Sequence, residues 1–392
     1  MAACLRLIHI FVGFLVTMDR KINIIALNIP YPPNYGGVID IYYKLEALHR
    51  QGVGIILHCF EYNRPQAPQL EKLCQEVHYY KRKTGLLTNL SLLPYNVYGR
   101  KNSLLLENLQ KNNYPILFEG LHSCYYLSHP TLKNRFKIFR ECNIEHDYYK
   151  KLALSEHSLV KKVFLFLESL RFAAYQRSIK HAQLSLCVSQ ADTDYLQKKF
   201  PKSHFVFMPC FHANTTVSAK TGQSDFILYH GKLSVAENEK AALFLIKNVF
   251  SKLPYRCVVA GMDPGKRLLN AAKKHANIVI ETDPTRERMD YLIREAQLNL
   301  LVTFQATGLK LKLLNSLFSG RHTIVNPLMV KGSGLDELCH IASNPQAMIS
   351  LCHRYMKIPF GQEEIEKRER LLLPFYSNDE QAKKMVELIF EK

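Results

Sequence analysis

The stretch KINIIALNIPYPPNYGGVIDIYYKLEALHRQGVGIILHCF, residues 21–60, decides the fold. It opens with a short apolar run rich in β-branched residues at 22–27 and passes through several prolines to a glycine pair. Residues 38–50 then place their apolar side chains at helical spacing, and 53–60 form a second apolar run. These patterns predict strand, loop, helix and strand. That order is the opening unit of a parallel α/β sheet.

Length and composition are those of a protein with more than one hydrophobic core. A chain of 392 residues exceeds what one core organises, and 47% apolar residues suffice for full-sized domains. The ten cysteines lack the spacings of a zinc site, so we interpret them as reduced, mostly buried thiols of a cytoplasmic protein. The 52 Lys and Arg outnumber the 34 Asp and Glu by 18. This surplus suits nucleic acid, an anionic membrane surface or phosphate-bearing substrates as partners.

Apolar runs repeat the strand pattern on both sides of a polar linker. In the first half, strands are expected at 22–27, 53–60, 115–119, 136–140, 184–188 and 205–208. In the second half, they are expected at 226–230, 256–261, 277–280, 298–303 and 323–326. Between these strands the apolar residues recur at helical spacing, which predicts helices there, and Pro374 is expected to separate the last two helices.

We therefore expect an α/β fold of two Rossmann-like parallel-sheet domains. The expected divisions are a leader or upstream extension at 1–20, a first domain at 21–210, a linker at 211–225, a second domain at 226–362, and C-terminal helices at 363–392 that pack back on the first domain. The apolar run in the leader is too short to span a bilayer, and Met18 is an alternative start. Ligands bind at the carboxyl ends of parallel strands, so the cleft between the domains is the expected site.

Five residues of the first domain are candidates for that cleft. Gly36 and Gly37 follow the first strand, where they would let a substrate approach the backbone, although a tight turn explains them equally well. His122 lies just past a strand end, as a ligand of a substrate or as a packed or capping residue. Glu145 and His146 belong to the segment NIEHDYY, which is either part of the site or a polar loop.

Three turns rich in glycine and lysine mark the second domain. Gly231-Lys232 follows a strand, residues 308–312 (GLKLK) open a helix, and 331–334 (KGSG) form a third turn. Helix-start amides and lysine ammonium groups can together bind a diphosphate without a metal. We therefore expect neither a metal nor another cofactor.

Two further patterns resemble metal sites but have a simpler explanation. Asp192 and Asp194 match a carboxylate pair that holds a metal on a nucleotide sugar, yet they fall in the first turn of a helix that a serine caps. The pairs Cys339-His340 and Cys352-His353 favour core packing, because adjacent residues diverge on a helix.

Taken together, these residues resemble the GT-B glycosyltransferases, specifically the retaining family 4 and its bacterial polysaccharide-type members. The resemblance runs from about residue 21 to the C terminus. Its motifs are Pro30-x-Pro32-x4-Gly37, Glu119-Gly120-Leu121-His122, the NIEHDYY segment at 143–149, Gly231-Lys232, Val258-Val259-Ala260-Gly261, and residues 307–314 (TGLKLKLL). It implies two Rossmann-like domains that face a central cleft. It also implies a hexosyltransferase that moves a sugar from a nucleotide-diphosphate donor to a glycan or lipid-linked glycan, without a metal and with retention.

The resemblance also implies roles for particular residues. His122 would lie beside the transferred sugar, Gly37 would line the reaction centre, and Gly36, Glu145 and His146 would bind acceptor or sugar. The donor would be bound by Gly231, Lys232, Thr307, Gly308, Leu309, Lys310, Lys312 and Asn315. The family often has Glu-x7-Glu where this chain has Thr307 and Asn315. An asparagine can still hydrogen-bond a ribose hydroxyl, but without charge assistance.

Two other functions compete with this interpretation. One is a nucleic-acid-binding protein, although the chain has no RNP, zinc-finger or helix-turn-helix signature, so no specific nucleic acid is expected. The other is a sugar-nucleotide epimerase of the same shape.

One stretch of the first domain bears on localisation. Between Tyr80 and Lys111, six basic residues stand against one acid, a balance of +5, among leucines and tyrosines. This stretch is either a buried helix with a basic border or a patch that docks on anionic lipid at the inner face of the membrane.

Overall fold

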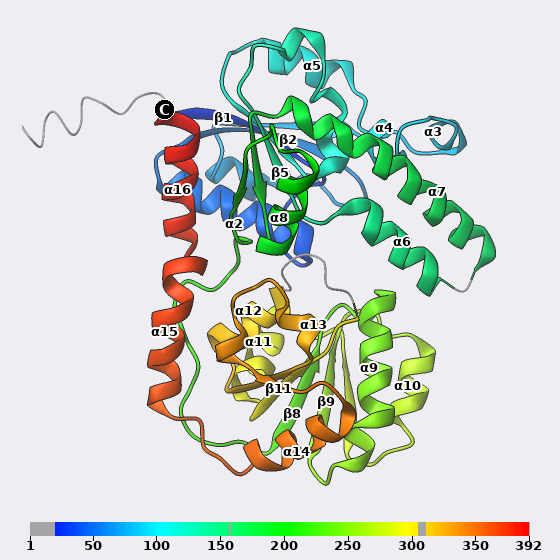
Figure 1. Ribbon diagram of the computed structural model, residues 1–392, viewed down its shortest axis with the longest axis vertical. Helices are drawn as coiled ribbons and strands as arrows, with labels where there is room; N and C mark the ends of the chain where they lie inside the picture. The colour runs from blue at the N-terminus through cyan, green and yellow to red at the C-terminus, as the bar shows by residue number, and fades with distance from the viewer. Residues whose placement is uncertain (1–19, 157, 305–310, 392) are drawn as a thin grey trace, which may run out of the picture.

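The computed structural model describes residues 20–156, 158–304 and 311–391, which form two parallel α/β units (Figure 1). The seven-stranded first sheet has the order β3-β2-β1-β4-β5-β6-β7, and the six-stranded second sheet has the order β10-β9-β8-β11-β12-β13. Every strand pairing in both sheets is parallel. The expected α/β class and the two Rossmann-like domains are therefore confirmed.

The bounds of the elements are as follows. The strands of the first sheet are β1 (Lys21–Ala26), β2 (Gly54–Glu61), β3 (Glu76–Lys81), β4 (Ile116–Glu119), β5 (Lys137–Glu141), β6 (Leu184–Cys187) and β7 (Phe205–Phe207). Those of the second are β8 (Phe226–His230), β9 (Arg256–Gly261), β10 (Ile278–Thr282), β11 (Leu298–Leu301), β12 (His322–Val325) and β13 (His340–Ile341). The first unit contains α2 (Gly36–Arg50), α3 (Leu86–Asn89), α4 (Tyr95–Tyr98), α5 (Ser103–Gln110), α6 (Glu145–Ser155), α7 (Leu159–Tyr175) and α8 (Gln190–Lys199). The second contains α9 (Ala236–Asn248), α10 (Lys266–Ala272), α11 (Arg286–Glu295), α12 (Leu311–Ser319), α13 (Pro327–Val330) and α14 (Pro345–Tyr355), and the chain ends with α15 (Gln362–Tyr376) and α16 (Asn378–Phe390).

The predicted strands all occur within a few residues of their expected bounds, but two strands had no prediction. β3 (EVHYYK) carries glutamate, histidine, tyrosine and lysine at the sheet edge, and only Tyr80 in it is buried. β13 is two residues long. Neither contains a continuous apolar run, because an edge strand buries only part of its surface.

The C-terminal helices differ from their expected arrangement in two ways. Pro374 lies inside the last turn of α15, and the break comes after Tyr376, where the Ser377 side chain accepts a hydrogen bond from the Glu380 amide of α16. A proline is tolerated there because the missing amide costs only one bond near the helix end. Helix α16 packs on the first unit, against α2, whereas Leu372 of α15 belongs to the core of the second unit.

The chain crosses between the units at two adjacent places. His212, in the first crossing, is buried, and its ring nitrogen Nε2 lies 2.9 Å from the Tyr376 carbonyl in the second. The Asn378 side chain donates to the His212 carbonyl at 2.7 Å and accepts from the His212 amide at 3.1 Å. Burial lowers the pKa of His212 to about 4, so this contact is made by a neutral ring. The two crossings therefore form one hydrogen-bonded junction.

A buried ionic network lies beside this junction at the carboxyl edge of the first sheet. Arg140 of β5 donates to both carboxylate oxygens of Asp40 in α2, at 3.1 and 3.0 Å, and to the carbonyls of Met208 and Pro209. Lys44 of α2 donates to Asp40 at 3.0 Å and to Glu119 of β4 at 2.7 Å. Asp40 also accepts from the Phe211 amide at 2.7 Å. One network thus joins α2, two central strands and the crossing segment.

The pKa values of the two acids differ because their cations are unequally shared. Burial by itself would raise the pKa of Asp40, but Arg140 and Lys44 outweigh it and hold this pKa well below its usual range. Burial raises the pKa of Glu119, which Lys44 only partly offsets. Asp40 is consequently the ionised acid at the centre of the network, bound by both cations.

Neutralising Asp40 is expected to destabilise the first unit strongly. Asp40→Asn leaves Arg140 and Lys44 buried with a single carboxylate, and breaking a buried pair costs about 3–5 kcal/mol. Urea unfolding followed by circular dichroism measures the change. The matched control is Asp379→Asn, which breaks the exposed pair with Arg50 and should cost no more than about 1 kcal/mol. Equal losses for the two variants would contradict a structural role for the network.

Candidate active site

Several contacts bring the carboxyl ends of the two sheets face to face. Arg286 of α11 donates to the Tyr43 hydroxyl of α2 at 2.6 Å. A side chain at Gly36 would lie 3.8 Å from Leu311 at the described start of α12. Gly332 has a φ of +73° and approaches α8 so closely that a Cβ would lie 2.9 Å from that of Ala191. These contacts join α2 and α8 of the first domain to α11, the start of α12 and the turn after α13 of the second domain, and they lie where the expected site would be.

His122 and Glu145 meet on the first domain. His122 follows β4, Glu145 is the first residue of α6, and His122 Nε2 lies 3.6 Å from a Glu145 oxygen. The imidazole packs edge-to-face on Phe172 of α7, with ring centres 5.2 Å apart. The sequence placed these two residues in different candidate segments, and the structure makes them one group.

Burial makes this pair electrically neutral at physiological pH. Burial, together with the positive charges of Arg100 and Arg82, lowers the pKa of His122 to about 3. Burial raises the pKa of Glu145 to about 8. The pair can therefore donate hydrogen bonds to hydroxyl groups and accept hydrogen bonds from them, and it is uncharged between about pH 3 and pH 8.

His146 lies apart from this pair. Its Nε2 lies 3.5 Å from the Tyr195 hydroxyl of α8 and 3.8 Å from a carboxylate oxygen of Asp147. Successive side chains of a helix point about 100° apart, so Glu145 and His146 cannot both face His122. Gly36 and Gly37 begin α2, and their amides lack an intrahelical acceptor as at any helix start.

A polar cluster forms on the second domain around the turn that follows β8. The Asn238 side chain of α9 donates to the Lys232 carbonyl at 3.0 Å. Lys312 of α12 donates to the Asn238 oxygen at 2.9 Å, and its ammonium lies 5.2 Å from the centre of the Tyr229 ring. Lys232 itself is exposed. The backbone of Lys232 and the side chain of Lys312, residues 80 positions apart that the sequence predicted as diphosphate ligands, therefore meet through Asn238.

The geometry of this turn depends on two glycines. The Gly231 amide donates to the Ala260 carbonyl at 3.1 Å, and a Cβ at Gly261 would lie 1.8 Å from the Gly231 carbonyl oxygen. No side chain fits at Gly261 without moving the turn. The motif Val258-Val259-Ala260-Gly261 is thus explained by close approach of backbone to backbone.

The remaining donor candidates are less directly placed. The Asn315 side-chain oxygen accepts from Asn214 of the crossing segment at 2.9 Å. Thr307, Gly308, Leu309 and Lys310 lie outside the described residues. Their roles stay predictions.

Asn238, Tyr229 and the Tyr43–Arg286 contact had no place in the sequence prediction. Asn238 was detectable, because it opens the helix that follows the Gly231-Lys232 turn, where polar side chains lie at the carboxyl edge of the sheet. Tyr43 and Arg286 gave no such signal, since their contact joins residues 243 positions apart.

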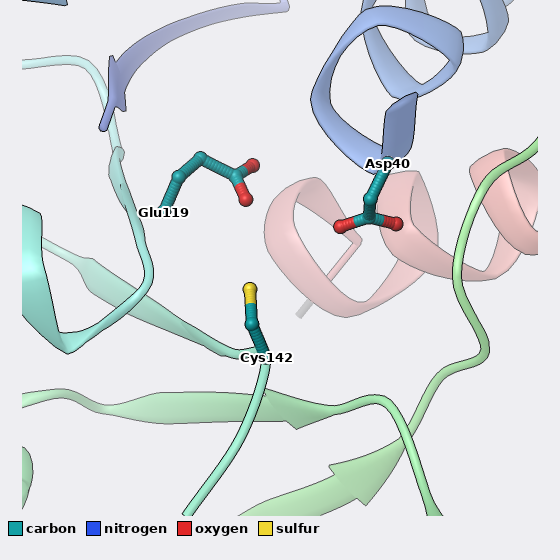
Figure 2. A group of neighbouring side chains, drawn as sticks. All are labelled: Asp40, Glu119 and Cys142. Carbon is teal, nitrogen blue, oxygen red and sulfur yellow. The ribbon is translucent and has the colours of Figure 1, made fainter. Parts of the chain in front are cut away.

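Asp40, Glu119 and Cys142 gather in a group that invites a test as a metal site (Figure 2). One ligand atom of each lies within 4.8 Å of the others. Lys44 and Arg140 already occupy this space, bonded to the two carboxylates, and burial raises the pKa of the Cys142 thiol well above its usual range. A divalent cation would have to displace both side-chain cations, so the donor set does not fit a resident metal.

The Asp192–Asp194 pair is confirmed as part of a helix start. The Ser189 hydroxyl accepts from the Asp192 amide at 3.1 Å, and Asp194 accepts from Gln190 at 2.7 Å. Asp192 is buried and Asp194 is exposed, so the two carboxylates do not face one ion.

Two other surface hollows lie away from the cleft. Their volumes are about 310 and 230 Å³. Their walls include Gly54 at the start of β2 and Lys21 at the start of β1, which are amino ends of strands. Substrates of such sheets bind at the opposite edge.

Comparison with known proteins places this arrangement in a fold. No family model matches the chain. An uncharacterised 44.6 kDa protein of the cps region of Klebsiella pneumoniae is 23% identical to this chain over 398 residues, which are 95% of this chain and 99% of that protein.

Similar structures include sucrose-phosphate synthase from Thermosynechococcus elongatus, with a TM-score of 0.68, 12% identity and coverage of 94% of this chain and 98% of that chain. Anabaena Alr3699/HepE, in complex with UDP and glucose, has a TM-score of 0.65, 10% identity and coverage of 95% and 100%. WaaG, a glycosyltransferase of lipopolysaccharide biosynthesis, has a TM-score of 0.64, 10% identity and coverage of 95% and 100%. The chain has the GT-B fold.

The raised pKa of Glu145 predicts a pH-dependent cost in stability. Between the unfolded pKa of 4.5 and the folded value of about 8, the unfolded chain loses the Glu145 proton while the folded chain keeps it. Folding stability therefore falls as pH rises through this window and levels off above 8. Glu145→Gln removes this contribution, so its stability relative to wild type should rise by ~1–4 kcal/mol from pH 5 to 8. Urea unfolding at several pH values measures the difference. A difference that does not change with pH would show that Glu145 ionises normally.

Proposed function

We propose that this protein is a glycosyltransferase that moves a sugar from a nucleotide-diphosphate donor to a glycan or lipid-linked glycan acceptor. The observation that carries the proposal is that the two domains present different polar groups near the carboxyl ends of their strands. The second domain presents Lys312, held by Asn238, beside the turn that carries the exposed Lys232, and the first presents the neutral His122–Glu145 pair. The similar Anabaena protein is described with UDP and glucose bound, which supports a sugar nucleotide as the donor.

The lysine cluster suits the charge that develops when the donor breaks. Departure of a nucleoside diphosphate places growing negative charge on its phosphate oxygens. Lys232 and Lys312 are ammonium groups that can stabilise this charge, and Asn238 holds Lys312 in position before the reaction begins. This arrangement supports a metal-independent reaction, because the chain itself supplies the positive charge.

The neutral pair suits recognition of sugar hydroxyls. His122, with its lowered pKa, can accept a hydrogen bond at one ring nitrogen and donate from the other without repelling a developing positive charge on the sugar. Glu145 keeps its proton up to about pH 8, and a protonated carboxyl does not act as a nucleophile. This supports retention by attack on the same face as the leaving group, rather than by a covalent glycosyl-enzyme through this carboxyl.

The decisive experiment is a thermal-shift assay with UDP, GDP and ADP at micromolar concentrations. A ligand at one hundred times its dissociation constant stabilises the folded protein by ~2.7 kcal/mol, which is readily measured. We expect one of the three to raise the melting temperature. No shift with any of them, up to millimolar concentrations, would contradict the proposal.

Removing Lys232 is expected to weaken binding of the nucleoside diphosphate that the assay identifies. Lys232→Ala should cost roughly 1.5–3 kcal/mol for each charged hydrogen bond lost, while binding of the free nucleoside should hardly change. Isothermal titration calorimetry measures both. Lys247→Ala, an exposed lysine near the other end of α9, is the control and should bind like wild type. Equal losses of binding free energy for the nucleoside and the nucleoside diphosphate would place the phosphate site elsewhere.

Lys310→Ala is expected to weaken diphosphate binding in the same way as Lys232→Ala.

Removing His122 is expected to affect turnover rather than donor binding. His122→Ala should lower turnover about a hundredfold, measured as release of the nucleoside diphosphate, and should leave its dissociation constant within about twofold. His129→Ala, a histidine of the same domain outside the cleft cluster, serves as the control. Unchanged turnover would return His122 to a packing role.

A further inference from the structure

Helix α7 exposes its apolar side chains and buries polar ones, the reverse of an ordinary surface helix. Six large apolar residues, each between 46% and 81% exposed, lie on it: Leu159, Val160, Val163, Phe166, Leu167 and Leu170. Their spacing of 1, 4, 7, 8 and 11 positions from Leu159 places them in one stripe along the helix. The opposite face buries Glu168 and Ser169. We call these six residues the α7 stripe.

The buried face explains why α7 lies where it does. Glu168 accepts from the Tyr95 amide at 2.8 Å and pairs with Arg171, and the Ser169 hydroxyl donates to the His146 carbonyl at 2.8 Å. Phe172 of the same face packs on His122. The helix is therefore held rigidly against the proposed active site while the α7 stripe points to solvent.

Neighbouring elements extend the apolar surface. Arg171 donates to the Asn89 carbonyl at 2.9 Å, which places the loop after α3 beside the C-terminal half of α7. Leu90 and Leu92 in that loop are 79% and 95% exposed. Figure 1 shows α6 and α7 side by side at one edge of the molecule. The stretch 80–111, which the sequence left open between a buried helix and an interfacial patch, supplies Leu90 and Leu92 to this surface, whereas its Tyr80 and Val97 are buried. The exposed apolar surface is centred on α7.

The charge around the stripe is positive. Between residues 148 and 167, four lysines stand against one glutamate, Glu156, a balance of +3. Lys150, Lys161 and Lys162 are exposed, and Lys162 borders the stripe. An apolar helical stripe with lysines at its margin is the pattern of a helix that lies in the plane of a membrane surface.

Charge also argues against a second copy of the chain as the covering partner. A two-fold dimer would place this surface against itself and oppose lysines with lysines. An anionic bilayer supplies the opposite charge and an apolar interior. None of the described helices is both long and apolar enough to cross a membrane, so contact would be made from the surface.

We propose that the α7 stripe docks this protein on anionic lipid bilayers. Leu, Val and Phe of the stripe insert at the boundary between headgroups and acyl chains, and Lys162 at the margin of the stripe contacts lipid phosphates. Since Phe172 touches His122 from the other face of α7, docking brings the active site to within about one helix diameter, ~10 Å, of the bilayer surface. This consequence rests on the proposed function, and it assigns a lipid-linked glycan as the acceptor.

Flotation of the full chain with lipid vesicles tests the proposal. Vesicles of phosphatidylcholine alone are compared with vesicles that contain about 30% phosphatidylglycerol. The apolar variant is Val163→Gln/Phe166→Gln/Leu170→Gln, and the charge variant is Lys162→Glu. The matched control is Val279→Gln/Tyr291→Gln/Ile341→Gln, which changes three residues of the second domain with 41–46% exposure.

We expect wild type and control to float with anionic vesicles at low salt and to bind more weakly at 0.5 M salt. Both α7 variants should bind at least about tenfold more weakly, and all proteins should keep the wild-type melting temperature because the changed side chains are exposed. The proposal is overturned if wild type does not bind anionic vesicles, or if the apolar variant binds as well as wild type. It is also overturned if light scattering shows a dimer that the apolar variant abolishes, since a second copy would then cover the stripe.

Measuring nucleotide binding by the same variants distinguishes a failure of membrane docking from a failure of the proposed function. Each variant is also measured in the thermal-shift assay with UDP, GDP and ADP. Loss of flotation with an unchanged nucleotide shift supports docking by α7. Flotation that does not depend on α7, together with a nucleotide shift, refutes docking and leaves the glycosyltransferase proposal standing.

Discussion

The buried pairing of Asp40 with Arg140 is the interaction on which the rest of the structure depends. Arg140 lies on a central strand, Asp40 lies in the first helix, and the same two side chains bind the backbone of residues 208, 209 and 211 where the chain leaves the first domain. Charges in such a place are tolerated only with full pairing. The pairing thereby determines where the chain crosses to the second domain and which edges of the two sheets face each other.

The second crossing reinforces the same constraint from the other end of the chain. Asn378 bonds both backbone groups of His212, and α16 then packs on α2, the helix that carries Asp40. The two crossings lie side by side, so any motion of one domain against the other must bend the chain at this junction. Tyr43 and Arg286 provide a direct contact across the cleft, and as a single partly buried hydrogen bond it can break when the domains separate.

The two domains present groups of different charge at the proposed site. The first domain buries His122 and Glu145, so His122 is neutral, Glu145 holds a proton, and the pair offers hydrogen bonds without charge. The second domain presents lysines at the turns that follow its strands. A sugar with its diphosphate leaving group needs both kinds of surface, one on each side of the bond that breaks.

The sequence by itself determined the local elements and their order, because β-branched runs, helical periodicity and glycine turns act over a few residues. Strands such as β1 and β8 and the turn at Gly231-Lys232 were predictable for this reason. Edge strand β3 was not, since its burial depends on a neighbour, and neither was the break after Tyr376, where the Ser377 cap prevails over Pro374. Only the tertiary structure decided that His122 meets Glu145, that Asn238 joins Lys232 to Lys312, and that the apolar stripe of α7 faces solvent. Each of these depends on contacts between distant segments, and burial, which sets the pKa values of the site, is a property of the packed chain rather than of any one residue.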